Sequence, residues 1–487
     1  MVNREQLVTE IAQEVIARLQ IHLNGGGGAP KATHAPAPAA APEPKRAPLG
    51  DGVFATVDEA VKAAAEAQKK VGALSLEDRG KMVAAIRRIC DERAEELGKM
   101  ELAESNIGRV DHKIEKLKII KNVVGEEAMR IEARSNTSGM CIIERAPWGV
   151  IGMVLPATHS VPTMAGNAIN ILAAGNTAVF SPHPHASKVA AYALQLFNRA
   201  FQKEVGIANA ITTMSEASIK AAEEVFHHPG IHLLTVTGGP AVVRAAAKTG
   251  KRVIAAGPGN PPVVVDETAD LDLAARCIIK GGGFDNNLLC LGEKQIFCVA
   301  SVFDKFKAAM RVAGAHELDR QAIDRLTQAA FSFDKGEPRV RKELVGKDVS
   351  VLAQAAGVRV PAAVQLLFGE TDANHPFVQE EQMMPFVPVV KVACIRAAID
   401  AAVQSEHGYR HTAIIHSRNI ENVTRMAKAM NTTLFVHNAP STGSLGVDGP
   451  GYLSYSIATP TGEGVTTPLT FTRERQLAIG AGGLRFI

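Results

Sequence analysis

The feature that most restricts the fold of this chain is a regular alternation of apolar runs and helical segments. Five runs read as buried strands, with helical segments between them: "GVIGMVLP", "TAVFSP", "AITTMS", "HLLTVTG" and "RVIAAG". This alternation predicts a parallel sheet with helices on both faces. A second series predicts a second domain of the same class: "PPVVVD", "QIFCVA", "FVPVVKVA", "TAIIHS" and "TLFVHN". We therefore predict an α/β fold with two parallel-sheet domains.

The first fifty residues differ from this pattern. Within residues 1–20 an apolar stripe recurs every four positions, at Leu7, Ile11, Val15 and Leu19. Such spacing predicts an amphipathic helix. Residues 21–50 are rich in Gly, Ala and Pro and predict a disordered linker. The pattern alone leaves two alternatives open for the helix: docking on another protein, or folding back on its own domain, including a part in oligomerisation.

Charge and cysteine usage exclude several classes of protein. A formal net charge of +3 without any basic run gives no electrostatic footprint for nucleic acid. No stretch approaches the roughly 18 apolar residues of a membrane span. The 6 cysteines include no C-x-x-C pair, which favours a reducing, cytosolic compartment over disulfides or structural zinc. His183 and His185 lack neighbouring Cys or acidic partners, so no metal site is predicted.

Ligands of open parallel sheets bind at the carboxyl ends of the strands. We expect those ends at "PATHS" (156–160), "SPHPH" (181–185), "TGG" (237–239), "AGPGN" (256–260) and the loop "FDNNLLCLGEK" (284–294). No G-x-G-x-x-G motif opens a helix, so a dinucleotide site has to be of another kind. Taken singly, the glycines are turn residues and Cys290 is a core cysteine, as we expect for Cys277 and Cys298.

Taken together and in this order, these segments resemble the aldehyde dehydrogenase superfamily over roughly residues 51–487. The stretch from "PWGVIGMVLP" to "FSPHP" resembles its first cofactor strand, helix and second strand. "LLTVTGG" resembles the turn over the cofactor pyrophosphate, and "QEEQMMPFVPVV" the acidic segment that faces the nicotinamide ribose. The resemblance implies two Rossmann-like domains and a β-flap for oligomerisation, with the chain assembled as a homodimer or homotetramer.

Domain boundaries follow from the resemblance. We expect a domain binding NAD and coenzyme A (CoA) at 51–258, with an oligomerisation hairpin near 134–147. A catalytic domain is expected at 259–440, and a C-terminal segment at 441–487 completes the flap. "NNLLCLGEK", "GPGNPPVVVD", "SPHP" and "GEGVTTPLTFTRER" resemble the CoA-acylating branch. Within it, a helix on an Ala/Pro linker resembles the propionaldehyde dehydrogenases of bacterial microcompartments. There such a helix is an encapsulation peptide, which would place the enzyme in the microcompartment lumen within the cytoplasm, bound through residues 1–20 to shell or core proteins.

The resemblance implies a mechanism for Cys290. Its thiolate attacks an aldehyde, the Cys290 backbone N–H and the His159 side chain stabilise the oxyanion, and the resulting thioester is transferred to CoA in ping-pong kinetics. His159 stands where an asparagine is usual. Ala255 stands where hydrolytic members carry a glutamate that activates water, so the thioester is expected to survive until the CoA thiol attacks.

Cofactor contacts are assigned by the same resemblance to Thr158, Ser181, His183, Gly238 and Glu381. A lysine usual at position 181 is absent, which favours NAD over NADP. From the residues alone, Thr158 can equally be a turn residue, Ser181 a strand end, and Glu381 a solvated charge.

Propionaldehyde is the favoured substrate of the predicted NAD-dependent, CoA-acylating dehydrogenase. The alternatives are an acetaldehyde-specific acylating enzyme, a hydrolytic dehydrogenase with another base, a non-catalytic microcompartment scaffold, and a reductase of an acyl phosphate. One methylene in an apolar pocket discriminates by only about 1–3 kcal/mol, so the sequence separates the two aldehydes poorly.

Overall fold

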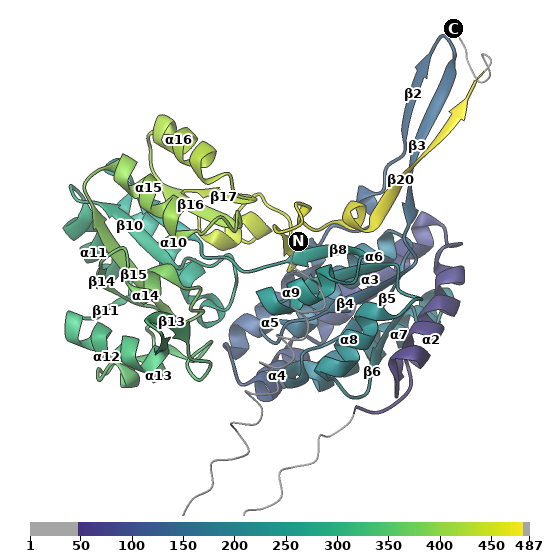
Figure 1. Cartoon of the computed structure of the whole chain (residues 1–487), viewed down its shortest axis with the longest axis horizontal. Coiled ribbons are helices and arrows are strands. Elements are labelled where there is room, and N and C mark those ends of the chain that lie inside the picture. The colour runs from purple at the N-terminus through teal and green to yellow at the C-terminus, as the bar shows by residue number, and fades with distance from the viewer. Residues whose placement is uncertain (1–46, 481–487) are drawn as a thin grey trace, which may run out of the picture. The chain divides into compact units, whose positions relative to one another are not determined.

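The computed structural model describes residues 47–480 (Figure 1). The predicted helix at 1–20 and most of the predicted linker lie outside the described residues. Residues 47–50, at the end of that linker, pack on the first domain. The Ala47 N–H donates to the Ser215 carbonyl at 3.0 Å, and the Gln195 amide donates to the carbonyls of Pro48 and Gly50 at 3.0 and 3.1 Å.

The first sheet has six parallel strands in the order β1-β6-β5-β4-β7-β8. Its strands are β1 (Val53–Phe54), β4 (Val150–Val154), β5 (Thr177–Ser181), β6 (Ile211–Met214), β7 (Leu233–Thr237) and β8 (Arg252–Ala256). All five strands predicted in this half are present, and β1 was not predicted because it is two residues long.

Helices cover both faces of this sheet, as the alternation predicted. Ile151 and Met153 face α3 (Leu76–Glu92), α6 (Ser160–Ala173) and α7 (Ser187–Val205). Val150 points the other way, toward α2 (Val57–Val71), α8 (Ile219–His227) and α9 (Pro240–Ala247). Successive strand residues therefore supply two separate cores. Thr56 and Glu59 form a capping box at the start of α2.

The second sheet has seven parallel strands in the order β11-β14-β15-β10-β9-β16-β17. They are β9 (Pro262–Val265), β10 (Gln295–Val299), β11 (His316–Glu317), β14 (Leu367–Thr371), β15 (Phe386–Val392), β16 (Thr412–His416) and β17 (Leu434–His437). The five predicted strands are again present, which confirms the α/β class with two parallel sheets.

One face of the second sheet packs on α10 (Leu271–Gly283) and α11 (Phe303–Val312), and the opposite face on α15 (Ile395–Ser405) and α16 (Ile420–Met430). Cys298 is fully buried on the first of these faces, and Cys277 is also buried, as expected of core cysteines. The remaining helices are α4 (Ala94–Ser105), α5 (Val110–Lys118), α12 (Arg320–Ala330), α13 (Val349–Ala355) and α14 (Pro376–Gln379).

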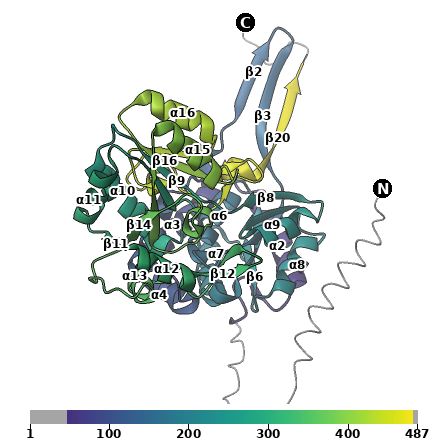
Figure 2. The same ribbon diagram turned by 60° about the vertical axis from the view of Figure 1, so that its left-hand side comes forward.

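A third, three-stranded antiparallel sheet extends outward from the first domain (Figures 1 and 2). It has the order β2-β3-β20 and joins the hairpin β2 (Glu132–Asn136) and β3 (Gly139–Pro147) to β20 (Thr472–Ile479). All five residues of β2 are exposed. Its part in oligomerisation stays a prediction, as do the three domain ranges. Two further hairpins are β12 (Phe331–Asp334) with β13 (Glu337–Val340), and β18 (Ile457–Ala458) with β19 (Gly464–Val465).

Among residues 47–480, none of the helices combines the length and apolar character needed to cross a membrane. The same residues contain no group of three or more His, Cys, Asp or Glu side chains arranged to hold a metal ion.

Candidate active site

The loop of Cys290 lies at the amino end of a strand, and our expectation of a carboxyl end was wrong. The chain reaches Cys290 from α10 and a short 3-10 helix (Phe284–Asn287), and β10 begins only at Gln295. The segment before Cys290 is not a strand but the helix α10. The apolar run after Cys290 is the strand, β10. Gly259, Glu381 and His411 likewise precede β9, β15 and β16. These strands are adjacent in the order β15-β10-β9-β16, so the four loops meet at one edge of the second sheet.

The first sheet contributes its carboxyl edge. Thr158 follows β4, Ser181 ends β5 and Gly238 follows β7. Between β4 and β7 the strand order changes direction, because β5 and β6 lie on one side of β4 and β7 and β8 lie on the other. Such a switch point is where open parallel sheets bind ligands. Residues 257–261 connect β8 of this sheet to β9 of the second.

The Cys290 loop has an unusual backbone. Asp285, Asn286 and Asn287 have φ angles of 49°, 58° and 62°. Asn and Asp tolerate this left-handed region better than other side-chain-bearing residues, which explains the composition of the motif. Two amides hold the turn: Asn286 donates to the Gly346 carbonyl at 3.0 Å and Asn287 to the Glu293 carbonyl at 2.9 Å.

The two charges behind Cys290 are buried and hold the loop from inside. The Lys294 ammonium donates to the carbonyls of Asn287 and Leu289 at 3.0 and 2.9 Å and to the Asn287 side chain at 2.5 Å. The Glu293 carboxylate accepts from the N–H and Oγ of Ser441 at 2.9 and 2.8 Å. A side chain at Gly281 would overlap this carboxylate, so glycine is required there.

The Cys290 thiol is protonated at neutral pH in this structure. Burial raises its pKa to about 12, the negative charge of Glu381 adds to the rise, and the positive charge of Lys294 opposes it. The thiolate that nucleophilic chemistry requires therefore depends on the charges that surround the sulfur.

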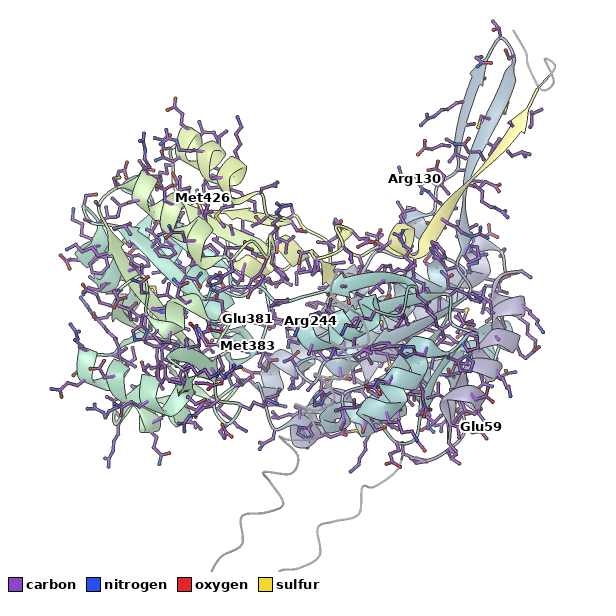
Figure 3. All side chains as sticks on the ribbon, viewed as in Figure 1. Glu59, Arg130, Arg244, Glu381, Met383 and Met426 are labelled. Atoms are coloured by element: carbon purple, nitrogen blue, oxygen red, sulfur yellow. The ribbon has the colours of Figure 1, made fainter. Side chains whose placement is uncertain are left out.

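Glu381 is placed beside Cys290 by Gly259, whose N–H donates to its carboxylate at 3.2 Å. Burial raises the pKa of Glu381 and lowers the pKa of Lys294, and the opposite charge of the partner partly reverses each shift. Figure 3 shows Glu381 and Met383 on the side of the second domain that faces Arg244 of α9. The structure thus brings Glu381 to the edge that carries Cys290, while its expected contact with the nicotinamide ribose stays a prediction.

His411 is a site residue that the sequence analysis missed. A Cβ at Gly259 would lie 2.7 Å from the Cys290 carbonyl oxygen and 2.8 Å from the His411 ring, so both residues pack closely against Gly259. Burial, aided by the charge of Lys294, lowers the pKa of His411 to about 3, which keeps the imidazole neutral. Its Nε2 is buried without a partner among the described residues. The signal that could have identified His411 is its position directly before the predicted strand β16.

His159 precedes α6 and is 5% exposed. Its ring lies against the Tyr455 ring, with 5.5 Å between centroids. Burial and the nearby charges of Lys116 and Lys113 lower its pKa well below the ordinary value, so the imidazole is neutral. Its Nδ1 and the Oγ of Ser160 are buried without partners within the described part of the chain. The assignment of His159 as an oxyanion donor stays a prediction.

The expected cofactor residues occupy different environments. Ser181 is buried, while His183 is exposed and accepts from the His185 N–H at 3.2 Å. Thr158 accepts through its carbonyl from the Lys113 ammonium at 3.2 Å. At Gly238 and Gly239 a Cβ would meet no atom within 4 Å, so the backbone before α9 is open to approach. With the unpartnered atoms of His159 and Ser160, this edge fits a ligand rich in polar groups, as a dinucleotide or CoA is.

Ala255 lies in β8, where it pairs with Val236 and is 1% exposed. Its N–H donates to the Thr461 hydroxyl at 3.0 Å. No carboxylate stands at this position, and the carboxylate whose negative charge acts on the Cys290 thiol is that of Glu381.

Comparison with known proteins shows which family this chain resembles in sequence and structure. The profile described as the aldehyde dehydrogenase family matches residues 49–451. The chain is 44% identical over 432 residues to an acetylating acetaldehyde dehydrogenase, EutE, of Salmonella typhimurium, covering 88% of this chain and 92% of that protein. It is 39% identical over 437 residues to a CoA-propanoylating propanal dehydrogenase of the same organism, covering 89% and 93%.

Three solved structures are similar along most of the chain. A propionaldehyde dehydrogenase of Rhodopseudomonas palustris, solved with bound CoA and an acylated cysteine, has a TM-score of 0.86 and 40% identity, covering 89% of this chain and 99% of that one. A propionaldehyde dehydrogenase from the fucose utilisation microcompartment of Clostridium phytofermentans has 0.87 and 37%, covering 90% and 100%. An engineered glycolyl-CoA reductase with bound NADP⁺ has 0.86 and 39%, covering 89% and 99%.

Proposed function

The chain belongs to the aldehyde dehydrogenase family, and from that premise we propose that it is a CoA-acylating aldehyde dehydrogenase. It converts a short aliphatic aldehyde, oxidised nicotinamide dinucleotide and CoA into an acyl-CoA, the reduced dinucleotide and a proton. The single observation that carries the proposal is the likeness over about nine-tenths of the chain to relatives named for acylating chemistry. The non-catalytic scaffold alternative is not favoured, because the cysteine loop is complete and fixed.

We assign the nucleophile to Cys290. Its sulfur adds to the aldehyde carbon, and the thiol proton leaves for a neighbouring base. Glu381 is suited to take it up, because its negative charge acts on the sulfur and burial has raised its pKa. The oxyanion is stabilised by the Cys290 N–H and by His159, whose neutral imidazole carries one N–H. Removing one such donor typically costs about 10²–10³-fold in turnover.

A nicotinamide dinucleotide bound here would supply the hydride acceptor for the C–H of the Cys290–aldehyde adduct, whose oxidation leaves a thioester on Cys290. We assign the contacts of the dinucleotide to Thr158, Ser181, His183, Gly238 and Glu381, along the carboxyl edge of the first sheet and the facing loop. NAD is the proposed dinucleotide, since Ser181 is uncharged and offers no ammonium for the 2′-phosphate of NADP. An engineered glycolyl-CoA reductase that is similar to this chain was solved with bound NADP⁺.

The acyl group then leaves Cys290 on the sulfur of CoA, because Ala255 provides no carboxylate to activate water. Without CoA, we expect the wild-type enzyme to form one NADH per Cys290 from propionaldehyde and NAD⁺ and then to stop. Adding CoA should restore continuous turnover. NADH formation is followed in a stopped-flow spectrophotometer, and the acyl-enzyme by intact mass. Continuous NADH and free propionate without CoA would instead identify a hydrolytic enzyme with another base.

Propionaldehyde is the proposed main substrate, and acetaldehyde the second candidate. The relatives of this chain include named enzymes for both. Comparing kcat/KM for the two aldehydes decides between them. The ratio of the two kcat/KM values is expected to be about 10–200, which is the discrimination that one methylene in an apolar pocket provides.

Residues 1–20, with their apolar stripe, are proposed as an encapsulation peptide that binds a microcompartment shell or core protein, with the enzyme body assembled as a homodimer or homotetramer. The stripe and the microcompartment origin of a structural relative support this proposal. Deleting residues 1–20 should leave turnover unchanged but remove the enzyme from purified microcompartments. Retention of the truncated enzyme in them would contradict the proposal.

A further inference from the structure

Four charged side chains that the proposed reaction does not use lie buried together between α4, α5 and the Cys290 loop. They are Glu101, Lys113, Lys116 and Asp285, and each side chain is at most 2% exposed. The Lys113 ammonium contacts Glu101 at 3.2 Å and Asp285 at 3.9 Å, and Lys116 contacts Asp285. Two carboxylates and two ammonium groups balance in charge. We call this set the charge tetrad.

One end of the charge tetrad fixes the nucleophile loop. Asp285 begins the left-handed run that leads to Cys290. Its carboxylate accepts from the Arg109 N–H at 2.7 Å, and its own N–H donates to His112 Nδ1 at 2.8 Å. Gly108, at φ +89°, allows this approach, because a side chain there would overlap the Asp285 carboxylate. A run of left-handed residues persists only when its surroundings over-determine it.

The other end fixes the segment that carries His159. The second carboxylate oxygen of Glu101 accepts from the Val161 N–H at 3.0 Å, in the first turn of α6. Lys113 donates to the Thr158 carbonyl at 3.2 Å. The charge tetrad therefore holds the backbone on both sides of His159. A third link runs through Tyr455, whose hydroxyl donates to the Lys116 carbonyl at 3.2 Å while its ring lies against His159.

We propose that the charge tetrad is a positioning device that sets the Cys290 loop in register with the His159 segment, so that sulfur and oxyanion donor meet the aldehyde in one fixed geometry. This inference rests on the proposed function. Buried ion pairs are weak stabilisers, since desolvation offsets much of their attraction, and an apolar contact fills such a space at no greater cost. An apolar contact, however, cannot form the hydrogen bonds that the charge tetrad makes with the backbone of Arg109, Val161 and Thr158.

Asp285→Asn tests the proposal. Asparagine keeps the shape and tolerates the left-handed backbone, but it removes the charge opposite Lys116. The measurement is the burst of NADH formed from aldehyde and NAD⁺ without CoA. The amplitude of the burst gives the number of competent active sites. Its rate constant gives the rate of acylation at each of these sites. We expect the rate constant to fall by about 10²-fold, as for a misplacement of about 1 Å, while KM for NAD⁺ changes little.

Asp266→Asn is the matched control. Asp266 is also fully buried and accepts hydrogen bonds from Thr268, Ser417 and Asn422, but it lies after β9, away from the Cys290 loop. Its burst rate constant should match that of wild type even where its melting temperature falls. If Asp285→Asn does not fold, Lys113→Met provides the same test, because it breaks the links to Glu101 and Thr158 and leaves the contact of Lys116 with Asp285.

A lower amplitude with an unchanged rate constant, in either variant, would show a structural role only and overturn the proposal. The wild-type burst separates this failure from failure of the proposed function. A wild-type burst that persists in both variants at full rate refutes the positioning role alone. A wild type without any burst refutes the acylating mechanism and the positioning role with it.

Discussion

In the Cys290→Ala variant we expect the steady-state rate of NADH formation from aldehyde, NAD⁺ and CoA to fall by about 10⁴-fold or more. Removing a covalent nucleophile takes away both halves of a ping-pong reaction, since neither the acyl-enzyme nor its transfer can form. The loop should keep its conformation, because the contacts that hold it come from Asn286, Asn287 and Lys294. The measurement is aldehyde-dependent absorbance of NADH, with the melting temperature as a check of folding.

The control is Cys394→Ala, which removes an exposed cysteine and should leave turnover unchanged. Cys90 and Cys298 are fully buried, which leaves their sulfurs without access to a substrate. Cys290 is neither fully buried nor freely exposed, and it is the cysteine at the edge where four loops meet. Aldehyde-dependent NADH formation that survives in Cys290→Ala would assign the chemistry to another residue.

The sequence was sufficient for the fold because its strands carry a local signal. Runs such as "TAVFS" and "TAIIH" became fully buried strands, β5 and β16, since apolar β-branched runs between helical segments have few other solutions. Strands β1 and β11 were not predicted because two residues make no pattern. Strand β14 was also missed, although its first three residues are buried. The hairpin of β12 and β13 was not predicted because its two strands are only four residues each and largely exposed.

The site was predicted less completely, for reasons of topology and charge. Cys290 was proposed as the nucleophile through its motif, but its loop was assigned to the wrong end of a strand, because a glycine-rich stretch hides the end of α10. His411 carries no motif, and only the neighbouring order of β9 and β16 brings it to Gly259. The partners of Asp285 lie about 170 residues earlier in the chain. Pairing over such separations is set by tertiary packing and leaves no local trace.

Lys294 and Glu381 shift the pKa of Cys290 in opposite directions. We therefore expect their removal to change that pKa in opposite directions. Lys294→Met removes a positive charge that lowers the pKa of Cys290, so we expect that pKa to rise further. Glu381→Gln removes a negative charge that raises it, so we expect it to fall. Well below the pKa, the thiolate fraction grows tenfold with each pH unit, because it is set by the difference between pH and pKa.

Alkylation of Cys290 by iodoacetamide, followed by peptide mass spectrometry from pH 7 to 10, measures both shifts. Relative to wild type, the profile of Lys294→Met should move to higher pH and that of Glu381→Gln to lower pH. Each unit of displacement corresponds to about a tenfold change in rate at fixed pH. The alkylation rate of the exposed Cys394, measured in the same samples, shows whether the reagent is equally active in each sample. Profiles that move in the same direction for both variants would contradict the opposing roles of the two charges.

Lys294→Met should also reduce stability, because it leaves the carbonyls of Asn287 and Leu289 and the Asn287 side chain without their buried donor. Leaving buried acceptors without a partner costs about 1–3 kcal/mol in the free energy of unfolding. Lys347→Met is the matched control: its ammonium also donates to a carbonyl, that of Asn106 at 2.6 Å, but in an exposed position. We expect the control to lose less than about 1 kcal/mol in urea unfolding. Equal losses in the two variants would mean that water replaces Lys294 inside the loop, and the Cys290 loop would then be held by the Asn286 and Asn287 amides and by the contacts of Asp285.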